Sequence, residues 1–114
     1  TALRVALARP AATAAIYRAC WAEDRAIGEP AVLAAILEEA GIDAAAALAA
    51  AESPAIKAAL RANTDAAREA GCCGVPSFVV SRPEAPAQAP VLLWGQDRLE
   101  MLERVLGGWT PPRG

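Results

Sequence analysis

The sequence predicts a mostly helical α+β fold with two short strands near its C-terminus. Three observations support this prediction. In the first seventy residues, proline and glycine separate alanine-rich segments at positions where helices begin and end. After Gly71 the pattern changes to two short runs of β-branched and aromatic residues. Leucines at helical spacing follow the second run, which indicates a final helix.

The segment before Pro10 is expected to form a short helix. Pro10 suits the first turn of a second helix, which we expect to run to about Ala26, with Gly28 just beyond its end. Its apolar face carries residues at helical spacing, namely Ile16, Cys20 and Trp21.

Pro30 begins the third predicted helix, and Gly41 stands where a left-handed residue ends a helix. A buried stripe repeats along this helix and consists of Val32, Leu33, Ile36, Leu37 and Ala40. Asp43 can cap a short fourth helix. Ser53 and Pro54 form the N-cap and first turn of a fifth, which carries Ile56 and Leu60 and ends at Gly71.

Two strands are expected after Gly71, at residues 75–80 and 91–94. The connection 81–90 contains Pro83, Pro86 and Pro90, so it is expected to be an exposed, irregular loop. The last helix is expected to begin at Gln96 and Asp97 and to end at residues 107–108, before a frayed tail. Its predicted buried face comprises Leu99, Met101, Leu102, Val105 and Leu106.

The composition restricts the classes of function. A chain of 114 residues can bury one modest core, and its formal net charge of −2 is spread over both signs without a block that would bind nucleic acid or a membrane surface. No apolar run approaches the roughly 20 residues that span a bilayer. No secretion signal is recognisable, so we expect a cytoplasmic protein.

The cysteines and the lack of histidine restrict the chemistry. The three cysteines, Cys20, Cys72 and Cys73, contain no C-x-x-C spacing, so reduced thiols are expected. Cys72 and Cys73 are interpreted as small apolar residues that pack at a helix-to-strand corner, with a strained vicinal disulfide as the alternative. Without histidine the commonest metal ligand and general base is missing, and no metal site is predicted.

Two segments carry a family resemblance. GVPSFVV at residues 74–80 and WGQDRLEMLERVL at residues 94–106 resemble the C-terminal signature of 2-hydroxychromene-2-carboxylate isomerases and kappa-class glutathione transferases, which share a DsbA-like thioredoxin fold. Residues 17–43 and 52–71 are similar to the helical insertion of this family. The resemblance implies a helical insertion domain at 1–71, the C-terminal ββα part of the thioredoxin-like domain at 72–108, and a tail at 109–114.

The resemblance implies a glutathione-dependent isomerase that acts on an aromatic small molecule. Members of the family begin with a strand, a turn containing Ser-Pro, a helix and a second strand, and that serine activates the glutathione thiol. None of these elements precedes Thr1. We therefore expect the chain to supply the glutathione-binding half, with no catalytic residue of its own and no activity alone. The missing half or a second copy of the chain is the expected partner.

Val75 and Pro76 form the first candidate binding segment. An X-Pro bond prefers trans by only about 0.5–1 kcal/mol, and the resemblance implies that this bond is cis. The backbone of Val75 would then be free to pair with the cysteinyl part of glutathione. The local sequence by itself favours the simpler interpretation that Pro76 only begins a strand.

Gln96 and Asp97 form the second candidate binding segment. A helix N-terminus attracts an anion, and the resemblance assigns Gln96 and Asp97 to the γ-glutamyl end of glutathione, with its α-carboxylate and α-ammonium. Without the family resemblance, Asp97 would be interpreted as an ordinary acidic residue in the first turn of a helix. Trp94 is expected to be a core residue or to line the wall of a pocket, without a chemical role. The resemblance also implies that the helical segment covers the aromatic substrate with apolar side chains, namely Ile16, Tyr17, Trp21 and Leu37.

Two other functions compete with this one. A DsbA-like disulfide oxidoreductase would need a C-x-x-C motif upstream of these residues, whereas WGQDR at residues 94–98 points to the glutathione branch of the family. A non-catalytic interaction module would use an exposed sheet edge to bind a partner chain.

Overall fold

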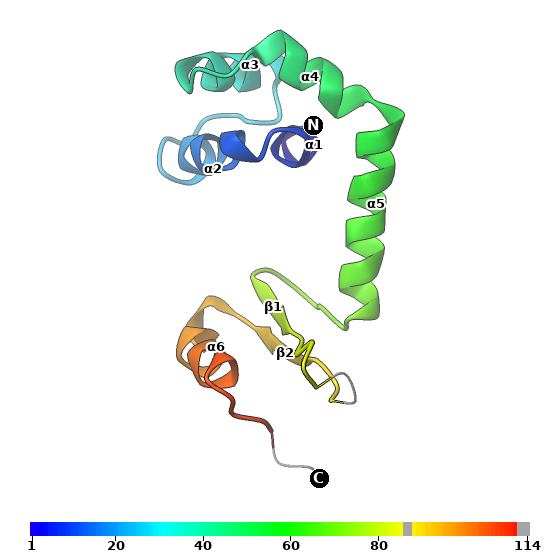
Figure 1. Cartoon of the computed structure of the whole chain (residues 1–114). Helices are drawn as coiled ribbons and strands as arrows, with labels where there is room; N and C mark the ends of the chain where they lie inside the picture. Colours follow the sequence, from blue (N-terminus) through cyan, green and yellow to red (C-terminus); the bar gives the residue numbers. More distant parts are fainter. Residues whose placement is uncertain (86–87, 112–114) are drawn as a thin grey trace. The chain divides into compact units, whose positions relative to one another are not determined.

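The computed structural model describes residues 1–85 and 88–111. This part of the chain is mostly helical and contains a two-stranded antiparallel sheet, which confirms the predicted fold class (Figure 1). The chain divides into two compact units, Thr1–Asn63 and Thr64–Gly114, and the division falls within the longest helix. The domain boundary that we expect after residue 71 stays a prediction.

The first unit is built from helices arranged around one core. The elements are α1 (Ala2–Ala8), a 3-10 turn η1 (Pro10–Ala12), α2 (Thr13–Trp21), α3 (Pro30–Glu39), α4 (Ala44–Glu52) and the start of α5 (Pro54–Glu69). Helix α1 packs on α4 and α2 packs on α3, so α1 and α2 form one layer and α3 and α4 the other (Figure 1). The largest fully buried side chains between them are Val5, Leu33 and Leu37.

Two helices of this unit begin at the predicted caps. The carboxylate of Asp43 accepts a hydrogen bond of 2.9 Å from the N–H of Ala46, and the hydroxyl of Ser53 accepts one of 3.3 Å from the N–H of Ile56. Each bond satisfies an amide that has no partner within its own helix. The cap signals in the sequence therefore locate the start of α4 and of α5.

Three helices end in the same glycine motif. Gly41 after α3, Gly71 after α5 and Gly108 after α6 have φ of +71°, +82° and +106°. In each case the amide after the glycine donates to the carbonyl oxygen five residues earlier, at 2.9, 2.9 and 3.0 Å respectively. This is the Schellman arrangement, which favours glycine because a side chain is strained at positive φ. The predicted helix ends at these glycines are confirmed.

The prediction for the second helix was wrong at its C-terminal end. Helix α2 stops at Trp21 rather than near Ala26, and Asp24 takes a left-handed conformation with φ of 51°. Continuing the helix would place Glu23 and Asp24 near its C-terminus, where negative charge is unfavourable. Trp21 is consequently 81% exposed instead of buried. Ala40, expected in the buried stripe of α3, is also exposed because α3 ends before it.

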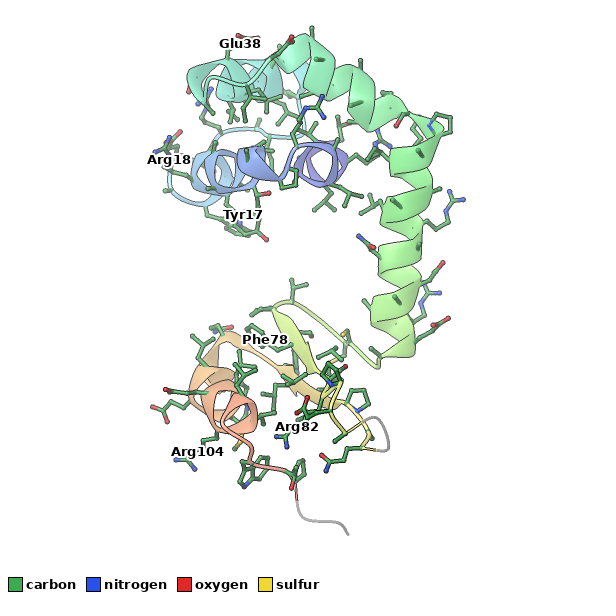
Figure 2. The ribbon with its side chains drawn as sticks, viewed as in Figure 1. Tyr17, Arg18, Glu38, Phe78, Arg82 and Arg104 are labelled. Carbon is green, nitrogen blue, oxygen red and sulfur yellow. The ribbon has the colours of Figure 1, made fainter. Side chains whose placement is uncertain are left out.

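The second unit contains a hairpin and a final helix. Strand β1 (Ser77–Val80) pairs antiparallel with β2 (Val91–Trp94), and the register joins Ser77 to Trp94 and Val80 to Val91. A 3-10 turn η2 (Gln96–Arg98) leads into α6 (Leu99–Leu106), which packs on both strands. Figure 2 shows Phe78 on the side of the hairpin that faces α6. The first strand begins later than predicted, because proline lacks the N–H that a ladder needs.

The buried face of α6 is narrower than predicted. Val105 is fully buried and Met101 and Leu102 are half-buried, whereas Leu99 and Leu106 are 57% and 68% exposed. Two four-residue strands cover only the middle of the leucine stripe. The outer leucines extend beyond the width of this sheet.

Arg82 connects the loop between the strands to the end of α6. Its Nη2 atom donates to the carbonyl oxygens of Val105 at 2.8 Å and Trp109 at 3.0 Å (Figure 2). Trp109 is therefore held by hydrogen bonds and not frayed, contrary to the expectation for the tail. Residues 112–114 of the tail and Pro86 of the loop lie outside the described residues.

Two clusters of charged side chains join the helices of the first unit. Arg25 donates to both oxygens of Glu39, at 2.7 and 3.1 Å. Glu52 accepts from Lys57 at 2.7 Å and from Arg4. The hydrogen bond from Arg25 lowers the pKa of Glu39, and the hydrogen bond from Lys57 is the main cause that lowers the pKa of Glu52.

Acidification should destabilise the first unit through these carboxyl groups. Because their pKa values are lower in the folded protein than the usual value of about 4.3, their contribution to stability is present above that value and is lost as the pH falls through the lowered values. A variant with Glu39→Gln and Glu52→Gln should lose less stability on acidification than the parent. Thermal unfolding followed by circular dichroism across this pH range tests this, and parallel pH profiles would contradict it.

Removing Arg82 should loosen the end of α6. Arg82→Ala should reduce the free energy of unfolding by about 1–2 kcal/mol, since hydrogen bonds from a charged donor contribute more than neutral ones. Arg104→Ala is the matched control, because Arg104 lies on α6 and points away from the hairpin (Figure 2). Hydrogen exchange of the α6 amides should accelerate in the first variant and not in the control. Equal exchange in both variants would refute this role for Arg82.

Candidate functional site

The four sequence-predicted binding residues lie at one end of the hairpin. Val75 and Pro76 directly precede β1, and Gln96 and Asp97 follow β2 after one residue. The N–H of Gly95 donates to the carbonyl oxygen of Pro76 at 3.0 Å, one step beyond the last strand pair. The structure therefore brings the two predicted segments together, although they are about twenty residues apart in the sequence.

Val75 presents its backbone and its side chain to solvent. The Val75–Pro76 peptide bond is cis, as the family resemblance implies. Val75 is 93% exposed, and within residues 1–85 and 88–111 neither its N–H nor its carbonyl oxygen has a hydrogen-bond partner. The preceding carbonyl, of Gly74, accepts a hydrogen bond of 2.6 Å from the hydroxyl of Ser77. The unpaired groups of Val75 can therefore bind an extended peptide as an added strand would.

Gly74 is packed under the indole ring of Trp94. A Cβ atom placed on Gly74 would lie 2.7 Å from Nε1 of Trp94 and 3.2 Å from its Cε2. Only a residue without a side chain allows the ring to come this close to the backbone. The sequence predicts that Trp94 lies in the core or lines a pocket. It does not reveal that Gly74 contacts this ring, because the contact depends on the strand register.

Gly95 allows the carboxylate of Asp97 to fold back toward the hairpin. Gly95 has φ of 115° and ψ of 148°, a conformation that is essentially restricted to glycine. A Cβ atom there would lie 2.3 Å from Oδ1 of Asp97. The other oxygen of Asp97 lies 3.8 Å from Nε of Arg98, and both side chains are largely exposed. The Asp97 carboxylate is thus accessible to a cationic ligand group.

Gln96 is exposed beside Asp97. Its side chain makes no hydrogen bond within the described part of the chain. A free amide group next to an exposed carboxylate can bind a ligand that carries both an anion and a cation.

One of the three cysteines is more exposed than the sequence interpretation predicts. All three are free thiols, and Cys72 is half-buried, but Cys73 is exposed rather than packed at the corner. In residues 1–85 and 88–111, no three His, Cys, Asp or Glu side chains lie close enough to hold a metal ion.

The first unit has a separate apolar hollow of about 210 Å³. Of the residues expected to cover a substrate, Ile16, Tyr17 and Trp21 line it. Leu37 does not, because it is fully buried in the core between the helices. Figure 2 shows Tyr17 on the side of α2 away from α3. The other lining residues come from α1, α2 and the loop after α2, and they are Ala2, Leu3, Ala6, Thr13, Cys20 and Ile27.

None of the helices in the described residues has the length and apolar character needed to cross a membrane.

Comparisons with known proteins identify the family to which the chain belongs. A search of curated proteins gives no match. The family model of the DSBA-like thioredoxin domain matches residues 1–107, which include the first unit, the second unit as far as Gly107, and all four candidate binding residues. The chain therefore belongs to the DSBA-like thioredoxin domain family.

Proposed function

We propose that this chain is the glutathione-binding part of a glutathione-dependent isomerase of the 2-hydroxychromene-2-carboxylate isomerase type, with an aromatic small molecule as the second substrate. The observation that carries the proposal is the hydrogen bond between Gly95 and Pro76. It holds the free backbone of Val75 beside the exposed pair Gln96 and Asp97. The DSBA-like family includes oxidoreductases and isomerases, which is consistent with this function.

The chemistry of glutathione matches these groups one by one. Its cysteinyl residue has an N–H and a carbonyl oxygen, which can pair with the carbonyl oxygen and N–H of Val75. Its γ-glutamyl end carries an α-ammonium and an α-carboxylate. Asp97 can accept hydrogen bonds from the ammonium, and the side-chain amide of Gln96 can donate to the carboxylate. Charged hydrogen bonds of this kind fix the orientation of the tripeptide.

In such a reaction, glutathione supplies a thiol that adds reversibly to the conjugated substrate and leaves again after isomerisation. The residues of this chain bind and orient the tripeptide. No residue among the 114 is assigned to the activation of the thiol. A disulfide oxidoreductase is the alternative enzyme. It would need a C-x-x-C motif upstream of these residues, whereas the segment WGQDR at residues 94–98 resembles the glutathione-using branch of the family.

Asp97→Asn should weaken glutathione binding by roughly tenfold, since a hydrogen bond to a charged group contributes about 1.5–3 kcal/mol and the site is exposed. Isothermal titration of the full 114-residue chain with reduced glutathione measures the affinity. Asp65→Asn is the matched control, because Asp65 is also an exposed acid beside an arginine, with 3.7 Å to Arg68. The control should bind like the parent.

The dipeptide Cys-Gly shows which end of the ligand Asp97 recognises. It lacks the γ-glutamyl residue, so the parent should bind it about as weakly as Asp97→Asn binds glutathione. Asp97→Asn should not lose further affinity for the dipeptide. Equal affinity of the parent and Asp97→Asn for glutathione would exclude the proposed role of Asp97.

Gly95→Ala should impair both the fold and the site. The strained φ and the collision with Asp97 should reduce the free energy of unfolding by about 1–3 kcal/mol, and the displaced carboxylate should weaken glutathione binding. Gly28→Ala is the control, because a Cβ atom on Gly28 would meet no atom within 4 Å. Urea unfolding and the same titration test both effects. A Gly95→Ala chain with the stability and affinity of the parent would show that this conformation is not required.

A further inference from the structure

Trp94 is a large aromatic residue that is exposed beside the proposed glutathione site. Its side chain is 56% exposed, and Val75, next to the glycine that Trp94 covers, is 93% exposed. A tryptophan normally buries most of its ring in a folded protein. Adjacent exposed apolar side chains indicate a surface that binds another group.

The strand register and Gly74 together place the indole ring of Trp94 at one end of the hairpin. The register pairs Trp94 with Ser77, directly after Pro76. The ring then lies against Gly74, directly before Val75, where a Cβ atom would come within 2.7 Å of Nε1. The ring therefore contacts the backbone at Gly74, and Trp94 remains 56% exposed.

A residue that pairs with the backbone of Val75 places its own side chain close to this ring. Side chains of paired strands project to the faces of a sheet, and Trp94 occupies one of these faces at its end. For glutathione, the residue paired with Val75 is the cysteinyl residue, whose sulfur carries or attacks the second substrate. An aromatic ring attached to that sulfur could then stack on the indole at the offset distances that aromatic pairs prefer.

We propose that Trp94 is a specificity-determining residue, which binds the aromatic group attached to the glutathione sulfur. This inference rests on the proposed function and adds to it the surface that selects flat aromatic substrates. Gly74 is required for this arrangement, because the side chain of any larger residue would displace the ring of Trp94 from the backbone.

The test compares two ligands that differ only at the sulfur, S-benzylglutathione and S-methylglutathione. Isothermal titration of the full chain should give the parent a roughly fivefold preference for the benzyl compound, the magnitude of an aromatic pair. Trp94→Ala should reduce the ratio of the two affinities to about one. Trp94→Phe should keep most of the preference, which shows that the aromatic ring and not only the fold is required.

Trp109→Ala is the matched control. Trp109 is an exposed tryptophan of the same unit, 42% accessible, and its known hydrogen bonds use its backbone. This variant should keep the preference of the parent. Because the measured quantity is a ratio within one protein, a general loss of affinity in a variant does not change it.

The outcomes separate the two proposals. A parent that binds S-methylglutathione but shows no preference for the benzyl compound, or a preference that survives in Trp94→Ala, would overturn the role of Trp94 and leave the proposed function standing. A parent that binds neither compound nor glutathione would overturn both. A preference that is lost in Trp94→Ala and kept in Trp94→Phe and Trp109→Ala would support both.

Discussion

The pairing of β1 with β2 is the constraint on which the candidate site depends. Each strand has only four residues, and the loop between them is too long to set their register by turn geometry. The register brings Ser77 opposite Trp94, and the next bond joins Gly95 to Pro76. A shift by one residue would invert the faces of one strand and move Trp94 off Gly74. The proposed cofactor site is thus a consequence of strand alignment.

Two contacts outside the ladder help to maintain this alignment. Helix α6 covers one face of the hairpin with Val105, which is fully buried. Arg82 ties the far end of β1 to the end of α6 through two carbonyl oxygens. The hairpin is therefore attached to the same helix by apolar packing and by a charged donor. This matters because an isolated two-stranded hairpin is at best marginally stable.

The parts of the fold that were predictable from the sequence depend on local chemistry. Asp43, Ser53 and the glycines that end three helices act within one helical turn, so their identity and spacing are sufficient. The end of α2 does not follow from apolar spacing, because Glu23 and Asp24 carry negative charge that is unfavourable near a helix C-terminus. The exposure of Leu99 and Leu106 could not be foreseen, since it depends on the width of the sheet that α6 meets.

The candidate site was predictable in its residues and not in its geometry. Val75, Pro76, Gln96 and Asp97 were identified because two motifs resemble a known family, and local sequence alone favoured simpler roles for them. The contacts of Gly74 with Trp94 and of Gly95 with Asp97 follow from backbone conformation and register. Neither is encoded in a spacing that can be read along one segment.

The anchoring of Arg82 also has a practical consequence for protein engineering. The site residues lie at one end of the four-residue strands and Arg82 lies beyond the other end, so at least the length of a strand, roughly 10 Å, separates them. Since Arg82 fixes the start of the connecting segment to α6, the residues after it do not have to hold the strands in register. A fluorophore or an affinity tag inserted after Glu84 would therefore leave the opposite end of the hairpin unobstructed.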